Sequence, residues 1–153
     1  MLNLEHLLNS NSFLFIENPT SKKKVFDKIC SVAFEKYNID KNLLLNNLMK
    51  REKIGTTTIG NGIAIPHVQN DKIIKPSCIV TILSKGLDFE ALDDTTVDLI
   101  VFLILPEASK TENLQILAQV SRLLRNSEIT DKLRGCKSEE SAFAIISQHL
   151  KNK

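Results

Sequence analysis

Residues 51–67 read Arg51-Glu-Lys-Ile-Gly-Thr-Thr-Thr-Ile-Gly-Asn-Gly-Ile-Ala-Ile-Pro-His67, and they include three of the five glycines of the 153-residue chain. The apolar run Ile63 to Ile65 precedes Pro66, which cannot donate to a sheet ladder and biases the residue before it toward an extended backbone. The run is therefore predicted to be a strand that stops at Pro66 and places the imidazole of His67 at its end.

The side chains of this stretch indicate an anion site that contains a nucleophile. Neutral imidazole is nucleophilic near pH 7, and phosphoryl transfer needs mainly positioning and donors aimed at the equatorial oxygens. Such donors are the backbone of Gly60 and Gly62, the hydroxyls of residues 56–58, and the forked guanidinium of Arg51 at the end of the preceding helical pattern. The chemistry alone leaves a second interpretation open, a structural histidine at a strand end beside a polar turn.

Gly60-Asn-Gly-Ile-Ala-Ile-Pro-His67, which ends sixteen positions after Arg51, resembles a known active-site signature. It is similar to that of the enzyme IIA proteins of the bacterial phosphotransferase system, in particular the nitrogen-regulatory class of the fructose–mannitol superfamily. The likeness covers most of the chain, from about Ser21 to the C-terminus. It implies that His67 accepts a phosphoryl group from a histidine-containing phosphocarrier protein and that Arg51 lies beside it.

The same resemblance implies roles for further residues. Thr56 and Thr57 match a Ser-Thr pair common in the class, which implies hydrogen bonds to the phosphoryl group, and Gly60 and Gly62 belong to the same site. Asn113 stands where many relatives carry a second histidine. Asparagine can donate a hydrogen bond but carries no positive charge, so phosphohistidine stability or transfer rate is expected to differ here.

The rest of the chain alternates between apolar runs and helical patterns. Strands are predicted over residues 13–16, 63–65, 78–83 and 97–105, with a short edge strand over 87–89 and a polar connection over 68–76. Helices are predicted from Thr20 or Ser21 to about Tyr37, from a cap at Asp40 to residues 50–52, from 109 to 124, from Asn126 or Ser127 to Gly135, and after Ser138.

The helix after the second long strand has a capping-box pattern, Ser109-Lys-Thr-Glu112. Its inner face is predicted to include Leu114, Leu117 and Val120. Asp98, among buried neighbours, is interpreted as a strand-start carboxylate with solvent access. The element order predicts an α/β (mixed α+β) fold in which a central mixed sheet is flanked by helices, as one domain over residues 1–153. It leaves the strand order open.

Composition narrows the class of function. Hydrophobic residues make up 42% and charged residues 25% of the chain, and 20 basic against 18 acidic residues give a net charge of +2. That balance argues against a nucleic-acid partner or a polybasic membrane surface. The three cysteines and three histidines show no metal-ligand spacing, so no metal is expected. The resemblance implies that the phosphoryl source is another protein, so no organic cofactor is expected either. The longest apolar run is far shorter than the roughly 20 residues of a membrane helix, and no signal peptide is evident; a cytoplasmic protein without membrane insertion is predicted.

Three hypotheses about function follow. The first is a phosphoryl carrier of a phosphoenolpyruvate-dependent phosphotransferase system that acts as a nitrogen-class regulator, with a phosphocarrier protein as donor and a regulatory target protein as partner. The second is a fructose- or mannitol-type transport IIA that passes the group to the cysteine of a IIB domain. The third is a regulatory binding module that is not phosphorylated, which Asn113 keeps open. A nucleotide-binding enzyme is disfavoured, because residues 60–62 lack the spacing of a P-loop or a dinucleotide fingerprint.

Overall fold

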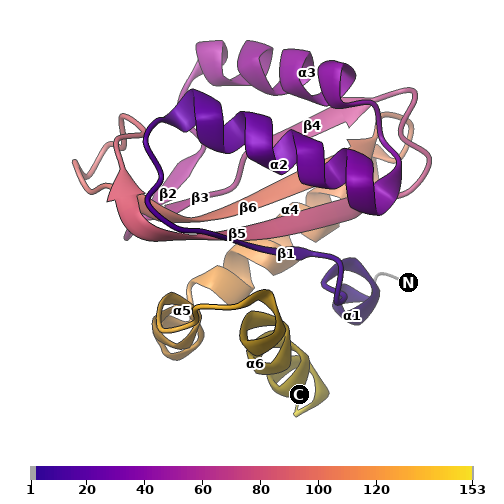
Figure 1. Ribbon diagram of the computed structural model, residues 1–153. Coiled ribbons are helices and arrows are strands. Elements are labelled where there is room, and N and C mark those ends of the chain that lie inside the picture. The colour runs from indigo at the N-terminus through magenta and orange to yellow at the C-terminus, as the bar shows by residue number, and fades with distance from the viewer. Residues whose placement is uncertain (1–2, 153) are drawn as a thin grey trace.

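The computed structural model describes residues 3–152 and contains one mixed sheet between two layers of helices (Figure 1). The strands are β1 (Phe13–Ile16), β2 (Thr58–Gly60), β3 (Ile63–Ala64), β4 (His67–Asn70), β5 (Ser77–Leu87) and β6 (Val97–Pro106). The helices are α1 (Leu4–Leu7), α2 (Lys22–Tyr37), α3 (Lys41–Ile54), α4 (Lys110–Leu124), α5 (Ser127–Arg134) and α6 (Glu139–Lys151). The predicted fold class is confirmed.

The strand order, which the sequence left open, is β1-β5-β6-β3-β2, with β4 also paired to β6. β5 and β6 are antiparallel, whereas β1 is parallel to β5, and both β3 and β4 are parallel to β6. β3 and β4 thus follow one another along the same edge of β6, with Ile63 opposite Leu99 and His67 opposite Leu103. This edge carries His67.

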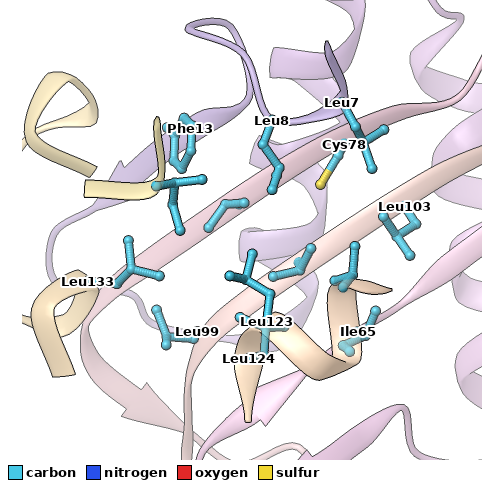
Figure 2. Packing of buried hydrophobic residues seen from close by; sticks show 14 of the residues in the cluster. Leu7, Leu8, Phe13, Ile65, Cys78, Leu99, Leu103, Leu123, Leu124 and Leu133 are labelled. Atoms are coloured by element: carbon cyan, nitrogen blue, oxygen red, sulfur yellow. The ribbon is translucent and has the colours of Figure 1, made fainter. Parts of the chain in front are cut away.

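Two apolar cores lie on opposite faces of the sheet, because successive side chains of β6 point to opposite faces. The α2–α3 core receives Ile100, Phe102 and Ile104 from β6. The α4–α6 core receives Leu99, Val101, Leu103 and Leu105. Figure 2 shows part of the α4–α6 core, which contains Ile65 and Leu103 together with Leu123 and Leu124 of α4 and Leu133 of α5.

Helix boundaries follow local capping chemistry. The hydroxyl of Ser21 accepts the backbone N–H of Lys24 at 3.1 Å, and the carboxylate of Asp40 accepts two N–H groups of the first turn of α3. Both predicted caps are confirmed. α3 continues to Ile54, past the predicted end at residues 50–52, because no proline or left-handed residue stops it before Gly55.

The prediction of a polar connection over residues 68–76 was wrong in its first part. His67–Asn70 forms β4, in which Val68 is 4% exposed and packs in the α2–α3 core. An edge strand needs only one buried face, so a single apolar residue between polar neighbours suffices. The predicted edge strand at 87–89 was also wrong: Leu87 ends β5, and Phe89 is buried against Phe26 at a centroid distance of 5.7 Å.

The inner face of α4 differs from the prediction. Leu114 is 68% exposed, whereas Asn113 is 2% exposed, and the buried face continues through Ile116 and Val120. Packing of the later turns against the sheet sets the helix rotation, and one residue corresponds to a rotation of about 100°. The Ser109 hydroxyl makes no capping hydrogen bond, so the predicted capping box does not form.

None of the helices between residues 3 and 152 combines the length and the apolar character that crossing a lipid bilayer requires.

Candidate functional site: a histidine at the sheet edge

His67 is half-buried at the first position of β4, and its neighbour in the sheet, Leu103, belongs to the α4–α6 core. The ring atom Nδ1 lies 3.1 Å from the carbonyl oxygen of Ile65. A carbonyl oxygen can only accept, so Nδ1 carries the proton and donates it. The other ring nitrogen, Nε2, then holds the free lone pair of the neutral imidazole.

The turn between β2 and β3 brings the chain back to this edge. Gly60, Asn61 and Gly62 have φ values of 91°, 56° and 78°, all in the left-handed region. Glycine adopts that region without the steric penalty of a Cβ, and asparagine tolerates it better than most residues. The turn is what allows residues 63–64 to pair antiparallel with β2 and lead into His67.

Two charged side chains from distant segments hold this turn. The carboxylate of Asp93 accepts the backbone N–H of Asn61 at 3.0 Å. Arg134, at the end of α5, donates to the carbonyl of Asn61, and its Nε lies 2.9 Å from the Asp98 carboxylate. Asp98 is therefore half-buried and forms an ion pair with the arginine that contacts the turn. The strand pattern of the sequence did not predict this ion pair.

Arg51 lies half-buried in the last turn of α3, and its guanidinium donates to the carbonyl of Gly55 at 3.1 Å. This contact folds the side chain over the beginning of the threonine-rich segment. That the side chain also lies beside His67, as the resemblance implies, stays a prediction. Within residues 3–152, no carboxylate forms an ion pair with Arg51. Its positive charge is thus open to an anion.

The threonine hydroxyls already have protein partners. The Thr56 hydroxyl lies 3.0 Å from that of Thr58 and 3.3 Å from the carbonyl of Phe89. Thr57 is 7% exposed and donates to the carboxylate of Glu52 at 3.2 Å. Direct hydrogen bonds from these hydroxyls to a phosphoryl group, which the resemblance implied, stay predictions and would require exchange of these partners.

Asn113 faces the sheet on the same side as His67. Its Nδ2 donates to the carbonyl of Pro106 at 2.7 Å, and its Oδ1 is buried with no hydrogen-bond partner among the described residues. If the Asn113 amide were flipped, its Oδ1 would face the Pro106 carbonyl oxygen, and two acceptors would meet without a proton. The Pro106 carbonyl therefore fixes the orientation of the Asn113 amide. Pro106 pairs with Asn70, three residues along β4 from His67, and a role of Asn113 in phosphoryl binding stays a prediction.

Replacing Asn113 with alanine is expected to lower the free energy of unfolding by about 1 kcal/mol, because a buried amide–carbonyl hydrogen bond is lost. Urea denaturation measures the change. The adjacent Leu114→Ala is the control, since that side chain is exposed and should shift stability by no more than about 0.5 kcal/mol. Equal effects of the two substitutions would contradict the assigned hydrogen bond.

The contribution of Asp93 to the stability of the turn can be tested at acid pH. Hydrogen bonds from the Thr95 hydroxyl and from the backbone N–H of Asn61 lower the pKa of Asp93 below its ordinary value of 3.8. A lowered pKa means that the contribution to stability is present above pH 3.8 and disappears as pH falls through the folded-state value. The stability difference between the unmodified protein and Asp93→Asn should therefore shrink below pH 3.8, as followed by urea unfolding. The matched control is the neighbouring Asp94→Asn, which removes a carboxylate without removing the hydrogen bonds from Asn61 and Thr95 to Asp93.

Two of the three cysteines are poor candidates for a covalent intermediate. All three are free and buried. Burial raises the pKa of the Cys30 thiol to about 12, and burial likewise raises the pKa of Cys78. The thiolate is the nucleophilic form, so these two remain protonated at neutral pH. In residues 3–152, no three His, Cys, Asp or Glu side chains gather as a metal site.

Comparison with known proteins places this chain in a family. Residues 6–149 match the model of the family described as "Phosphoenolpyruvate-dependent sugar phosphotransferase system, EIIA 2". The chain belongs to this family of phosphotransferase-system IIA proteins.

The similar proteins include nitrogen regulatory proteins and a sugar-specific component. The chain is 37% identical to a nitrogen regulatory protein of Pseudomonas aeruginosa, with 95% of this chain and 96% of the relative covered. It is 29% identical to a fructose-specific EIIA component of Haloferax volcanii, with 86% of each chain covered. The crystal structure of the nitrogen regulatory protein IIA-Ntr of Neisseria meningitidis superposes with a TM-score of 0.84 at 26% identity, covering 93% of this chain and 97% of that one.

The structure therefore brings the threonine segment, the glycine turn and His67 to one edge of the sheet. Arg51 contacts the carbonyl of Gly55 at the start of the threonine segment, and its position beside His67 stays a prediction. Four contributors were not predicted: the Ile65 carbonyl, Glu52, Asp93 and Arg134. Only Glu52 had a signal, since it stands within the Arg51-Glu-Lys sequence that carried the resemblance. Backbone carbonyls, and residues that come from distant segments of the chain, leave no local sequence pattern.

Proposed function

We propose that this protein is a phosphoryl carrier of a phosphoenolpyruvate-dependent phosphotransferase system, with His67 as the acceptor. The observation that carries the proposal is the hydrogen bond from Nδ1 to the Ile65 carbonyl at 3.1 Å. It supports a single neutral tautomer in which Nε2 keeps its lone pair. Half-burial of the ring is compatible with access by a donor protein and then by a recipient.

The transfer conserves atoms and electrons without any cofactor. The Nε2 lone pair forms a new N–P bond while the N–P bond to the donor protein's imidazole breaks, and the donor ring takes back that electron pair. The positive charge that develops on the His67 ring is shared with the Ile65 carbonyl through Nδ1–H. The phosphoryl group is displaced in line, so catalysis rests on positioning and electrostatics.

The surrounding residues would hold the transferred group. Arg51 would pair with the phosphoryl oxygens, because its guanidinium has no carboxylate partner in the described chain. Backbone N–H groups at Gly60 and Gly62, the hydroxyls of Thr56 and Thr57, and the amide of Asn113 are further candidates that a bound phosphoryl group would have to recruit.

The donor is proposed to be a histidine-containing phosphocarrier protein of the cytoplasm, and the recipient of the signal a regulatory target protein. The 37% identity to a nitrogen regulatory protein over 95% of the chain supports regulation. The fructose-specific relative keeps the second candidate, delivery of the group to a IIB cysteine in sugar uptake. Exposed apolar side chains beside the site residues, Ile54 at 82% and Leu114 at 68%, are available to such partners.

Intact-mass spectrometry tests the proposal. The protein is incubated with phosphoenolpyruvate, enzyme I and the phosphocarrier protein from one organism, with a second IIA as a positive control for the donor. One added phosphoryl group, lost in acid and mapped to His67, is expected. No added mass while the control IIA is phosphorylated would overturn the carrier function and favour a binding module. Subsequent transfer to a purified IIB domain would favour sugar uptake over regulation.

A further inference from the structure

Glu52 is a buried carboxylate next to the candidate site. It lies in the last turn of α3, directly after Arg51, and its side chain is 6% exposed. One oxygen, Oε1, is 2.6 Å from Nζ of Lys22 at the start of α2, and the other, Oε2, accepts the Thr57 hydroxyl at 3.2 Å. Glu52 thus connects two helix ends to the threonine segment.

The cation of this pair, whose side chain is 30% exposed, lies against two aromatic rings. Nζ of Lys22 lies 4.9 Å from the centroid of the Phe89 ring and 5.7 Å from that of Phe26. Aromatic faces attract an ammonium group, and these two rings belong to the α2–α3 core. The carboxylate of this pair is also far more buried than that of the surface pair Lys41–Asp27, because the Glu52 side chain is 6% exposed and the Asp27 side chain is 52% exposed.

Hydrogen bonds continue from Glu52 to the acceptor ring. The Thr57 carbonyl accepts the backbone N–H of Ile65 at 3.0 Å. The Ile65 carbonyl in turn accepts Nδ1–H of His67 at 3.1 Å. Pro66 restricts the backbone of Ile65 to extended conformations, so a displacement of Thr57 is passed on to the carbonyl that orients the imidazole.

Stability alone is a weak reason for such a pair. Removing two charges from water offsets most of their attraction, and well-packed apolar residues often stabilise a protein equally well. A fixed carboxylate does, however, impose one geometry on its partners. We propose that Glu52, held by Lys22, is a positioning residue: through Thr57 and the Ile65 carbonyl it keeps the His67 ring in the Nδ1–H tautomer, with Nε2 free to accept.

Two variants cut this network at different points. Glu52→Gln keeps an acceptor for Thr57 but leaves the Lys22 ammonium without a counter-charge. Thr57→Val keeps the ion pair and the side-chain shape but removes the hydroxyl, and Thr57→Ser should restore it. Lys41→Met is the matched control. Lys41 starts α3 as Lys22 starts α2, and the substitution removes an ion pair that lies on the surface.

The first measurement is the tautomer state of His67 by long-range 1H–15N NMR, which needs no phosphoryl donor. We expect the Nε2–H form, minor in the unmodified protein, to rise in Glu52→Gln and Thr57→Val but not in Thr57→Ser or Lys41→Met. The second is the rate constant of phosphoryl acceptance. We expect it to fall roughly 10- to 100-fold in the first two variants, as when a reacting group is misplaced by about 1 Å.

The NMR measurement tests the positioning role of Glu52 by itself. The rate measurement also rests on the proposed function of the protein as a phosphoryl carrier. Unchanged ring 15N shifts in both network variants, even with lower stability, would overturn the positioning role and leave an ordinary structural ion pair. Altered shifts support it even if no IIA activity is found. If Glu52→Gln does not fold, the ring 15N shifts of Thr57→Val decide between the positioning role and an ordinary ion pair. If Thr57→Val lowers the rate of phosphoryl acceptance without changing the tautomer of His67, the positioning role is overturned and Thr57 contacts the phosphoryl group directly.

Discussion

Replacing His67 with glutamine is expected to abolish phosphoryl acceptance, with a loss of at least roughly 10⁴-fold in rate, the scale seen when a covalent nucleophile is removed. The glutamine amide can still donate a hydrogen bond to the Ile65 carbonyl, so the strand start should be preserved. It offers no nitrogen lone pair for an N–P bond, because the amide nitrogen's pair is delocalised. Intact-mass analysis after incubation with the donor proteins measures the loss.

The chain supplies controls for this variant. His6→Gln and His149→Gln remove the other two histidines and should leave phosphoryl acceptance within about twofold of the parent, because neither residue belongs to the site. A His67→Gln protein that folds normally and still gains one acid-labile phosphoryl group would place the acceptor elsewhere and refute the assignment.

The second large effect is on stability. Gly62→Ala is expected to lower the free energy of unfolding by about 2–4 kcal/mol, combining the penalty of a left-handed backbone with overpacking. Its φ is +78°, and an added Cβ would lie 2.9 Å from Nη2 of Arg134 and 3.0 Å from the Thr96 carbonyl. The arginine tip can move, but the backbone carbonyl cannot move without displacing the start of β6. Urea denaturation and thermal unfolding measure the loss.

Gly55→Ala is the matched control for Gly62→Ala. Its backbone is extended, with φ of 161°, and nothing lies within 4 Å of an added Cβ. Stability should change by less than about 1 kcal/mol, because alanine there mainly reduces the freedom of the unfolded chain. If both substitutions were equally harmless, the turn at residues 60–62 would not be a close-packed element of the site.

Much of the fold could be predicted because local chemistry specifies it. The apolar runs at residues 78–83 and 97–105 became the two long strands, since so many consecutive apolar residues need burial on both faces. Ser21 and Asp40 capped helices because their side chains reach the free N–H groups of the next turn. Two of the errors, at residues 68–70 and at Leu114, fell where packing against β6 decides between solvent and core.

The candidate site likewise has features that the sequence specified and features that only the fold specified. The sequence by itself determined which side chains were available: an imidazole after a strand-ending proline, a guanidinium at a helix end, and glycines in a tight turn. Those are properties of residue types and of their neighbours in the chain. Only the tertiary structure decided which atoms meet. It brought Lys22 to Glu52, Arg134 to the turn at Asn61, and Asn113 to the Pro106 carbonyl. The first two contacts join residues far apart in the chain, and the third joins the end of β6 to the first turn of α4. Strand order and helix rotation, set by burial of the two cores, determine which of these contacts form.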